Sequence, residues 1–149
     1  RKTAYEISNW SLGGQYPCEH NLAYWHSTGY IGLGAGAHSY FAGYRYSNEL
    51  SPRKYIDRAM SGQDVAVERE LIGEELARAE SVILGLRLNE GFTLTPDELD
   101  RLADCRQAGL LQTDCRGVTR LTTRGRLLSN EVFWRMLPNG PAANIPRLV

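Results

Sequence analysis

Apolar residues recur every three or four positions in the middle of the chain, and this spacing predicts an amphipathic helix from about Val67 to Asn89. Its apolar stripe would comprise Ile72, Leu76, Ala79, Ile83 and Leu86. Gly91 is expected to end it. A shorter helix is predicted from Pro52 to Met60, because proline is tolerated in a first turn, Ser51 can cap it and Gly62 can stop it.

The C-terminal third predicts two helices around a β-hairpin. Thr95-Pro96-Asp97-Glu98 has the residues of a capping box with proline at the first helical position, and the helix should end before Gly109. Residues 110–114 and 118–122 flank Cys115-Arg116-Gly117, which is typical of a hairpin. Thr122 or Thr123 is expected to cap a last helix. The buried residues of that helix would be Leu127, Leu128, Val132 and Met136, and Pro138-Asn139-Gly140 would terminate it.

Helix, helix, hairpin and helix in this order indicate a winged-helix-like unit. The tail from Pro141 to Val149 is expected to be mobile. The earlier part of the chain differs, since glycine and aromatic residues predominate there. Ala4 to Ile7 predicts the end of a strand, and Tyr30 to Leu33 predicts a second strand that runs into glycines. The stretch from Tyr44 to Pro52 breaks the apolar period, so we place a domain boundary between residues 48 and 49.

Composition narrows the class of protein. The 149 residues, 42% hydrophobic and 23% charged, suffice for one modest core or one core plus part of another. A formal net charge of +0 gives no global attraction to nucleic acid or anionic membranes. No apolar run is as long as a membrane span. Cys18, Cys105 and Cys115 follow no disulfide or cluster pattern, which favours reduced thiols in the cytoplasm.

Residues suited to binding a flat ligand concentrate between Cys18 and Trp25. On a helical turn, His20 and Tyr24 would share a face and Trp25 would flank them, so the imidazole could ligate heme iron while the rings pack on the macrocycle. The alternative is that His20 and Asn21 hydrogen-bond to local backbone while Tyr24 and Trp25 fill a core. The residues alone leave both interpretations open.

The glycine-rich stretch from Gly32 to Ser39 is a second candidate. Gly34 and Gly36 could let the backbone approach an adenine or a porphyrin edge, or could simply form a tight strand exit. A dinucleotide-binding motif is excluded because Ala37 stands where glycine is needed. His38 could be a second iron ligand or a hydrogen-bonded structural residue.

Four further sets have plainer alternatives. Glu6 could touch a cofactor or substrate, or could be a surface or salt-bridged carboxylate. A zinc set would combine Cys18, His20, His26 and His38, but no pair has the usual ligand spacing. Cys105 and Cys115 are expected to be small buried groups. The hairpin arginines are Arg116, Arg120, Arg124 and Arg126, and they could contact DNA phosphate. Against DNA, the preceding helix has four acidic residues, Asp97, Glu98, Asp100 and Asp104, against Arg101 and Arg106.

Four motifs occur in a specific order: Tyr5-Glu6-Ile7-Ser8-Asn9, His20-Asn21-x-x-Tyr24-Trp25, the Gly32–Ser39 loop and Gly85-Leu86-Arg87. In this series the chain resembles the later half of the HemW family, which are radical-SAM heme chaperones related to oxygen-independent coproporphyrinogen III oxidase. The family's C-x-x-x-C-x-x-C motif is absent. The chain therefore resembles a C-terminal portion of such a protein, and we expect this portion alone to be incapable of radical chemistry.

The resemblance implies an α/β fold in which residues 1–48 end a radical-SAM partial TIM barrel and residues 49–149 form a mainly helical, winged-helix-like domain. It implies heme binding and delivery of heme to acceptor proteins, membrane-associated ones included, without a nucleic-acid partner. The full-length protein would also hold a 4Fe-4S cluster and S-adenosylmethionine. The implied binding residues are His20, Asn21, Tyr24, Trp25, Gly34, Gly36 and His38, with His20 as the iron ligand and no catalytic residue. A coproporphyrinogen III oxidase is the alternative, and H-N-x-x-Y-W favours the chaperone.

Overall fold

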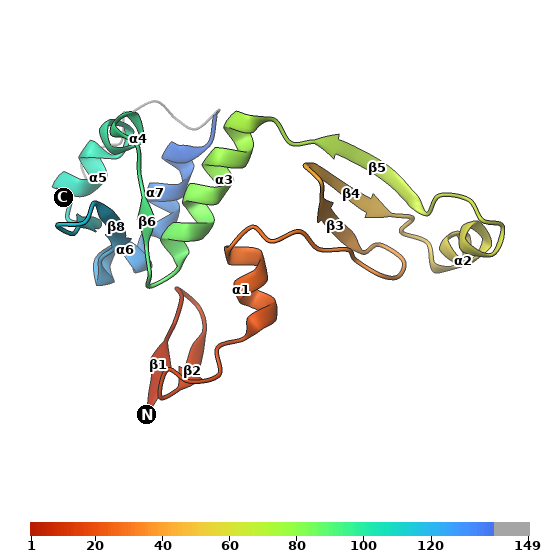
Figure 1. Cartoon of the computed structure of the whole chain (residues 1–149), viewed down its shortest axis with the longest axis horizontal. Helices are drawn as coiled ribbons and strands as arrows, with labels where there is room; N and C mark the ends of the chain where they lie inside the picture. The colour runs from red at the N-terminus through yellow and green to blue at the C-terminus, as the bar shows by residue number, and fades with distance from the viewer. Residues whose placement is uncertain (139–149) are drawn as a thin grey trace. The chain divides into compact units, whose positions relative to one another are not determined.

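The structure, a computed structural model, describes residues 1–138 (Figure 1). They divide into two compact units. The larger unit comprises residues 1–27 together with the described residues from 75 onward, and the smaller unit comprises residues 28–74. These units divide the chain after residues 27 and 74. The domain boundary predicted between residues 48 and 49 stays a prediction. The predicted tail from 141 to 149 lies outside the described residues.

The larger unit begins with an antiparallel hairpin of β1 (Lys2–Ala4) and β2 (Trp10–Leu12), followed by the short helix α1 (Glu19–Trp25). The strand predicted at Ala4–Ile7 lies instead at Lys2–Ala4. The chain turns after β1, where Glu6 makes one isolated bridge with Leu88. Every strand pair among the described residues is antiparallel, so the expected parallel strands are not found within them.

The rest of the larger unit packs around α3 (Glu74–Arg87). After α3 come β6 (Phe92–Thr93), α4 (Pro96–Arg101), α5 (Ala103–Gln107), β7 (Leu111–Thr113), β8 (Val118–Leu121), α6 (Thr123–Leu127) and α7 (Ser129–Met136). The strands form an antiparallel sheet in the order β6-β8-β7. The core joins Val82 and Leu86 of α3 to Leu102, Val132 and Met136. Figure 1 shows α7 running beside α3.

Local signals in this region are confirmed. Thr95 and Glu98 form the predicted capping box, and the Thr122 hydroxyl accepts a hydrogen bond from the Gly125 N–H. Strands β7 and β8 form the predicted hairpin, and β6 is an additional strand. The predicted helices are each interrupted, at Leu102 and at Leu128. Because of the second break, the prediction that Leu127 is buried is wrong: its side chain is 83% exposed.

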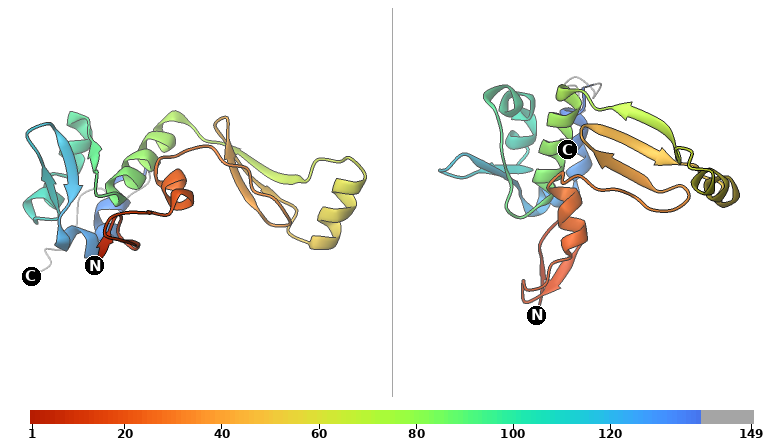
Figure 2. Two further views of the ribbon diagram at one scale, coloured as in Figure 1. Left: turned by 60° about the horizontal axis from the view of Figure 1, so that its bottom comes forward. Right: turned by 45° about the vertical axis from the view of Figure 1, so that its right-hand side comes forward.

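The smaller unit is an antiparallel sheet in the order β3-β4-β5, with helix α2 at one end (Figure 2). Its elements are β3 (His38–Phe41), β4 (Tyr44–Asn48), α2 (Pro52–Met60) and β5 (Ala66–Leu71). The bounds predicted for α2 are confirmed, but the Ser51 side chain makes no capping hydrogen bond. The predicted strand at Tyr30–Leu33 is wrong apart from an isolated bridge between Tyr30 and Tyr40.

The helix predicted from Val67 begins only at Glu74. Residues 66–71 pair with β4 instead, because Val67, Arg69 and Leu71 alternate with two glutamates in the two-residue period of a strand. The apolar stripe is confirmed from Ala79 to Leu86, where Val82 adds a fully buried member. No helix within residues 1–138 combines the length and apolar character that crossing a membrane requires.

Candidate functional site

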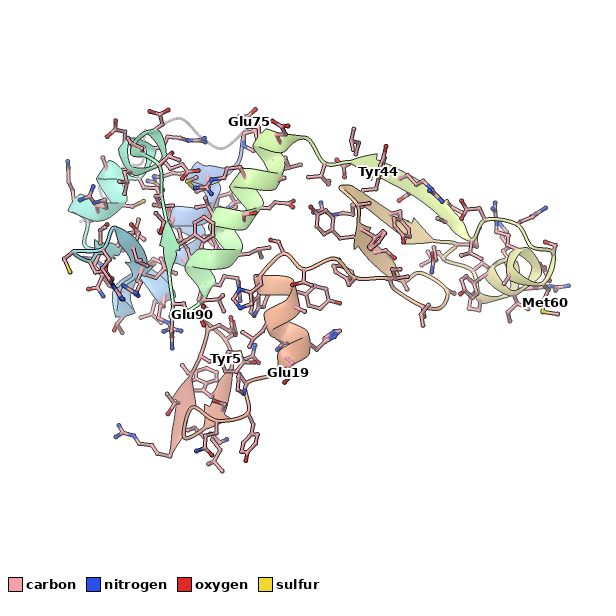
Figure 3. The ribbon with its side chains drawn as sticks, in the orientation of Figure 1. Tyr5, Glu19, Tyr44, Met60, Glu75 and Glu90 are labelled. Atoms are coloured by element: carbon pink, nitrogen blue, oxygen red, sulfur yellow. The ribbon has the colours of Figure 1, made fainter. Side chains whose placement is uncertain are left out.

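Helix α1 carries the four residues of the H-N-x-x-Y-W motif. Glu19 at its first position, labelled in Figure 3, favours helix initiation because a carboxylate interacts well with a helix N-terminus. The rings of His20 and Tyr24 lie edge to face with their centroids 4.9 Å apart, as expected from the four-residue step. His20 is exposed, whereas Asn21, Tyr24 and Trp25 are half-buried. The helix therefore presents an imidazole to solvent with an aromatic ring beside it.

Trp25 anchors this helix. The guanidinium carbon of Arg87, the last residue of α3, lies 4.3 Å from the centroid of the Trp25 ring, within the range of a cation–π interaction. The Tyr5 hydroxyl also accepts a hydrogen bond of 3.4 Å from the Cys18 N–H, just before α1. These contacts tie the N-terminal hairpin, α1 and α3 to one another. Trp25 thus makes a structural contact, and contact of its ring with heme stays a prediction.

Arg87 is held in turn by Glu6. One Nη2–Oε2 distance between them is 3.1 Å, and the Glu6 side chain is completely buried. The second carboxylate oxygen of Glu6 accepts hydrogen bonds from the Ser8 N–H at 2.7 Å and from the Asn9 side-chain amide at 2.6 Å. Of the two interpretations of Glu6, the salt-bridged carboxylate is confirmed. Three of the four sequence motifs therefore meet at one place through Glu6, Arg87 and Trp25, a convergence that the sequence analysis missed.

Gly34 and Gly36 lie in the smaller unit, in a loop held from beneath by Asn48. The buried Asn48 side-chain amide donates to the carbonyl oxygens of Gly32 at 3.2 Å and Gly34 at 3.0 Å. Gly34 and Gly36 have φ values of +102° and +69°, which favour glycine. A side chain on Gly32 would place its Cβ only 2.2 Å from the His38 carbonyl oxygen. These glycines are explained by the tight fold of the loop, and ligand contact there stays a prediction.

His38 is exposed at the start of β3, where it pairs with Ser47 of β4. It belongs with Gly34 and Gly36 to the smaller unit, whereas His20, Asn21, Tyr24 and Trp25 belong to the larger one. The candidate residues therefore form two sets.

A cavity of about 430 Å³ in the smaller unit was not anticipated from the sequence. Phe41, Tyr44, Tyr46 and Tyr55 line it together with the backbone of Gly32. The signal that could have revealed it is the alternation of Tyr44 and Tyr46 with polar residues, which places both rings on one face of β4.

No three His, Cys, Asp or Glu side chains within residues 1–138 come close enough to hold a metal ion. Cys18 and Cys115 are exposed free thiols, so the expectation that Cys115 is buried is wrong. Cys105 is buried, as expected, and burial raises the pKa of its thiol to about 11. The described thiols thus give no binding site for an iron–sulfur cluster. Ligation of heme iron by one imidazole needs no such group of three.

Three of the four arginines of the hairpin and α6 have partners within the larger unit, and Arg124 is exposed. Arg120 and Arg116 both contact the Asp114 carboxylate, at 2.8 and 3.5 Å. Its hydrogen bond with Arg120 holds the pKa of Asp114 well below its usual range. Arg126 donates to the side-chain oxygen of Asn89 at 2.6 Å. The Asp114 carboxylate therefore reduces the positive charge that Arg116 and Arg120 could offer to DNA phosphate.

Comparison with known proteins relates these motifs to curated relatives. The chain is 36% identical over 148 residues to the heme chaperone HemW of Bacillus subtilis, with 89% of this chain covered. It is 35% identical over 138 residues to the heme chaperone HemW of Mycobacterium tuberculosis, again with 89% covered. The chain is a relative of the HemW proteins. It spans 38% of the length of the first relative and 34% of the second.

The fold has a solved counterpart. Coproporphyrinogen III oxidase (HemN) from Escherichia coli, a radical SAM enzyme, matches with a TM-score of 0.61 and 18% sequence identity. The match covers 74% of this chain and 29% of the HemN chain. The matched part of the chain therefore shares the fold of part of the HemN chain. No protein-family model matches it.

Proposed function

We propose that the chain is the C-terminal part of a cytoplasmic HemW-type heme chaperone that binds heme on α1 and passes it to acceptor proteins. The likeness to relatives named heme chaperones supports this proposal most strongly. The likeness to HemN concerns the fold alone, so it gives the oxidase alternative no support of its own. The chain would represent the end of the radical-SAM barrel and the domain that follows it.

The residues of α1 are suited to heme. An exposed imidazole is a common axial ligand of heme iron, and the Tyr24 ring beside His20 offers an apolar edge to a macrocycle. Bound heme would supply an iron atom with an open coordination position and a large planar apolar surface. His20 would bind this iron, while Tyr24 would limit the orientations of the imidazole. Asn21, half-buried on the same helix, could donate a hydrogen bond from its amide to a ligand.

Trp25 and Arg87 would position the helix. The stacked guanidinium and its ion pair with the buried Glu6 fix the end of α1 against α3. A helix anchored at one end, with its imidazole in solvent, can present a ligand to an acceptor without rearrangement of the core. This arrangement suits transfer, because a deeply enclosed heme would have to be released from a cavity first.

The 4Fe-4S cluster would belong to another part of the full-length protein. The described thiols do not form a cluster site. Gly34, Gly36 and His38 remain candidates for contact with S-adenosylmethionine. We also propose a winged-helix-like arrangement for the elements from α3 to α7, because helix, strand, two helices, a hairpin and further helices follow in that order and β6 pairs with the second hairpin strand.

Heme titration of variants tests the ligand assignment. His20→Ala should weaken heme binding about tenfold or more, or shift the Soret band, because it removes the imidazole that would hold the iron. His26→Ala is the matched control, since His26 is also exposed and directly follows α1. His38→Ala should chiefly affect the glycine loop. Wild-type binding by His20→Ala, together with loss of binding in Cys18→Ala or His38→Ala, would assign the ligand elsewhere.

A further inference from the structure

Three arginines surround a second, smaller cavity in the larger unit. Its volume is about 180 Å³, and Arg87, Arg120 and Arg126 contribute to its lining with Asn89 and leucines. The arginines come from three elements, the end of α3, strand β8 and helix α6. No carboxylate is among the lining residues. The cavity is therefore bordered by three cationic groups that the fold brings together from distant parts of the sequence.

The charges of these arginines are only partly balanced. Glu6 pairs with Arg87 and Asp114 pairs with Arg120. Arg126 donates to the neutral side chain of Asn89 and has no carboxylate partner within residues 1–138. One positive charge thus remains uncompensated at the cavity. Asn89 also accepts from the Arg120 Nε through its carbonyl oxygen at 3.2 Å, so the guanidinium groups of Arg120 and Arg126 are held near one another.

Two guanidinium N–H donors of the lining residues are buried without a hydrogen-bond partner in the described part of the chain: Arg87 Nε and Arg126 Nη2. Unpartnered buried donors are rare in folded proteins because desolvating them without a hydrogen bond is unfavourable. A group with two or more acceptor oxygens and a negative charge would satisfy these donors and balance Arg126. Guanidinium groups bind such oxyanions through paired hydrogen bonds.

We propose that this cavity is a binding site for a small oxyanion, namely a carboxylate or phosphate group. The site includes Arg126 as the principal cation, with Asn89 positioning it and Arg120. It is separate from the exposed His20 of α1, and the proposal does not depend on heme binding. A carboxylate and a phosphate share the required acceptor oxygens, so the two are separated by experiment.

The test titrates the chain with inorganic phosphate, with acetate and with chloride at constant ionic strength. Calorimetry and the ¹⁵N-resolved NMR signals of the arginine Nε–H groups are the readouts. We expect saturable binding of phosphate or acetate, with chloride producing no saturation. Saturation by phosphate alone assigns a phosphate site, and saturation by acetate alone assigns a carboxylate site. Absence of saturation by both anions overturns the proposal.

A matched pair of variants locates the site. Arg126→Gln should weaken anion binding about tenfold, since it removes the uncompensated charge and a donor. Arg124→Gln removes the same charge from an exposed position two residues away on α6 and should leave binding unchanged. Equal losses in the two variants would mean general screening of surface charge and would overturn the proposal.

Asn89→Asp provides a second test of the site in case the Arg126→Gln variant does not fold. It places a carboxylate where Arg126 now meets an amide oxygen, so the internal anion should compete with phosphate and acetate. We expect it to abolish binding while the circular dichroism spectrum stays that of wild type. Undiminished binding in folded Asn89→Asp would overturn the proposal. Neither probe contains iron, so a negative result here leaves the heme titration unaffected.

Discussion

The two units differ in how completely they bury their apolar side chains and pair their charged groups. The larger unit contains the contiguous core around Val82, Leu102 and Val132, together with the buried Glu6–Arg87 ion pair. In the smaller unit the buried apolar residue among those described is Ile72, while Leu33, Leu50 and Met60 are 87%, 79% and 84% exposed. Burial of apolar surface is the main favourable contribution to folding. The larger unit should therefore account for most of the stability that the chain can generate by itself.

The largest expected effect comes from Glu6→Ala. Removing this carboxylate leaves Arg87 without its ion-pair partner. It also removes the oxygen that accepts hydrogen bonds from the Ser8 N–H and the Asn9 side-chain amide. Loss of one partner of a buried pair lowers the free energy of unfolding by about 3–5 kcal/mol. Urea unfolding followed by tryptophan fluorescence measures it, because Trp10, Trp25 and Trp134 all lie in the larger unit.

The control for Glu6→Ala is an ion pair of the smaller unit. Asp64 contacts Arg69, and both side chains are more than half exposed. Solvent screens exposed ion pairs, so Asp64→Ala should change the unfolding monitored by circular dichroism little. Comparable losses in the two variants would contradict the contrast between the units.

Substitution of a tightly packed glycine should have an intermediate effect on stability, and an open glycine provides the control. An alanine at Gly125 would place its Cβ 1.9 Å from the backbone oxygen of Leu110, which cannot move without disturbing the β7–β8 hairpin. Overpacking of this kind destabilises by about 1–3 kcal/mol. At Gly73 no atom lies within 4 Å of the added Cβ, so Gly73→Ala should be tolerated. Thermal unfolding of both variants compares them, and equal melting temperatures would refute the expected difference.

The smallest expected effect concerns helix capping. Thr95→Ala removes a hydroxyl that accepts the Glu98 N–H in the larger unit, and loss of such a cap destabilises by about 1 kcal/mol. Ser51→Ala in the smaller unit should change little, because the Ser51 side chain makes no capping bond. Urea midpoints for the two variants measure the difference. A greater loss of stability for Ser51→Ala than for Thr95→Ala would contradict the assignment of Thr95 as the stabilising cap.

Features encoded within a few adjacent residues could be predicted from the sequence. Helix α2 and the β7–β8 hairpin have their signals in neighbouring residues, and both are confirmed. The β4–β5 pairing was missed because α2 separates the two strands in the sequence. The β3–β4 hairpin is a local feature that was also missed. The strand pattern of Val67 to Leu71 was also absorbed into the helical period that begins with Ile72. Neither break at Leu102 and Leu128 has a glycine or proline to mark it.

The same limit applies to the candidate site. The neighbourhood of His20 and Tyr24 followed from their four-residue spacing, because a helix places such residues on one face. The ion pair between Glu6 and Arg87 joins residues 81 positions apart and leaves no local signal. Its only trace in the sequence is the joint presence of the two motifs. The arginine cavity is likewise assembled by packing of α3, β8 and α6, so no short stretch of sequence indicates it.

The three cysteines differ in burial, so their rates of alkylation can report how often the core of the larger unit opens. Thiolates, rather than thiols, react with alkylating reagents. At neutral pH the exposed Cys18 and Cys115 should be modified readily, whereas Cys105, 1% exposed and with a pKa raised to about 11, reacts only after the core around it separates. The rate at which a third label appears in a mass spectrum therefore counts openings of the larger unit, in a purified sample or in a crude extract. A dye on Cys18, one residue before α1, would meanwhile follow events at His20 without entering the core.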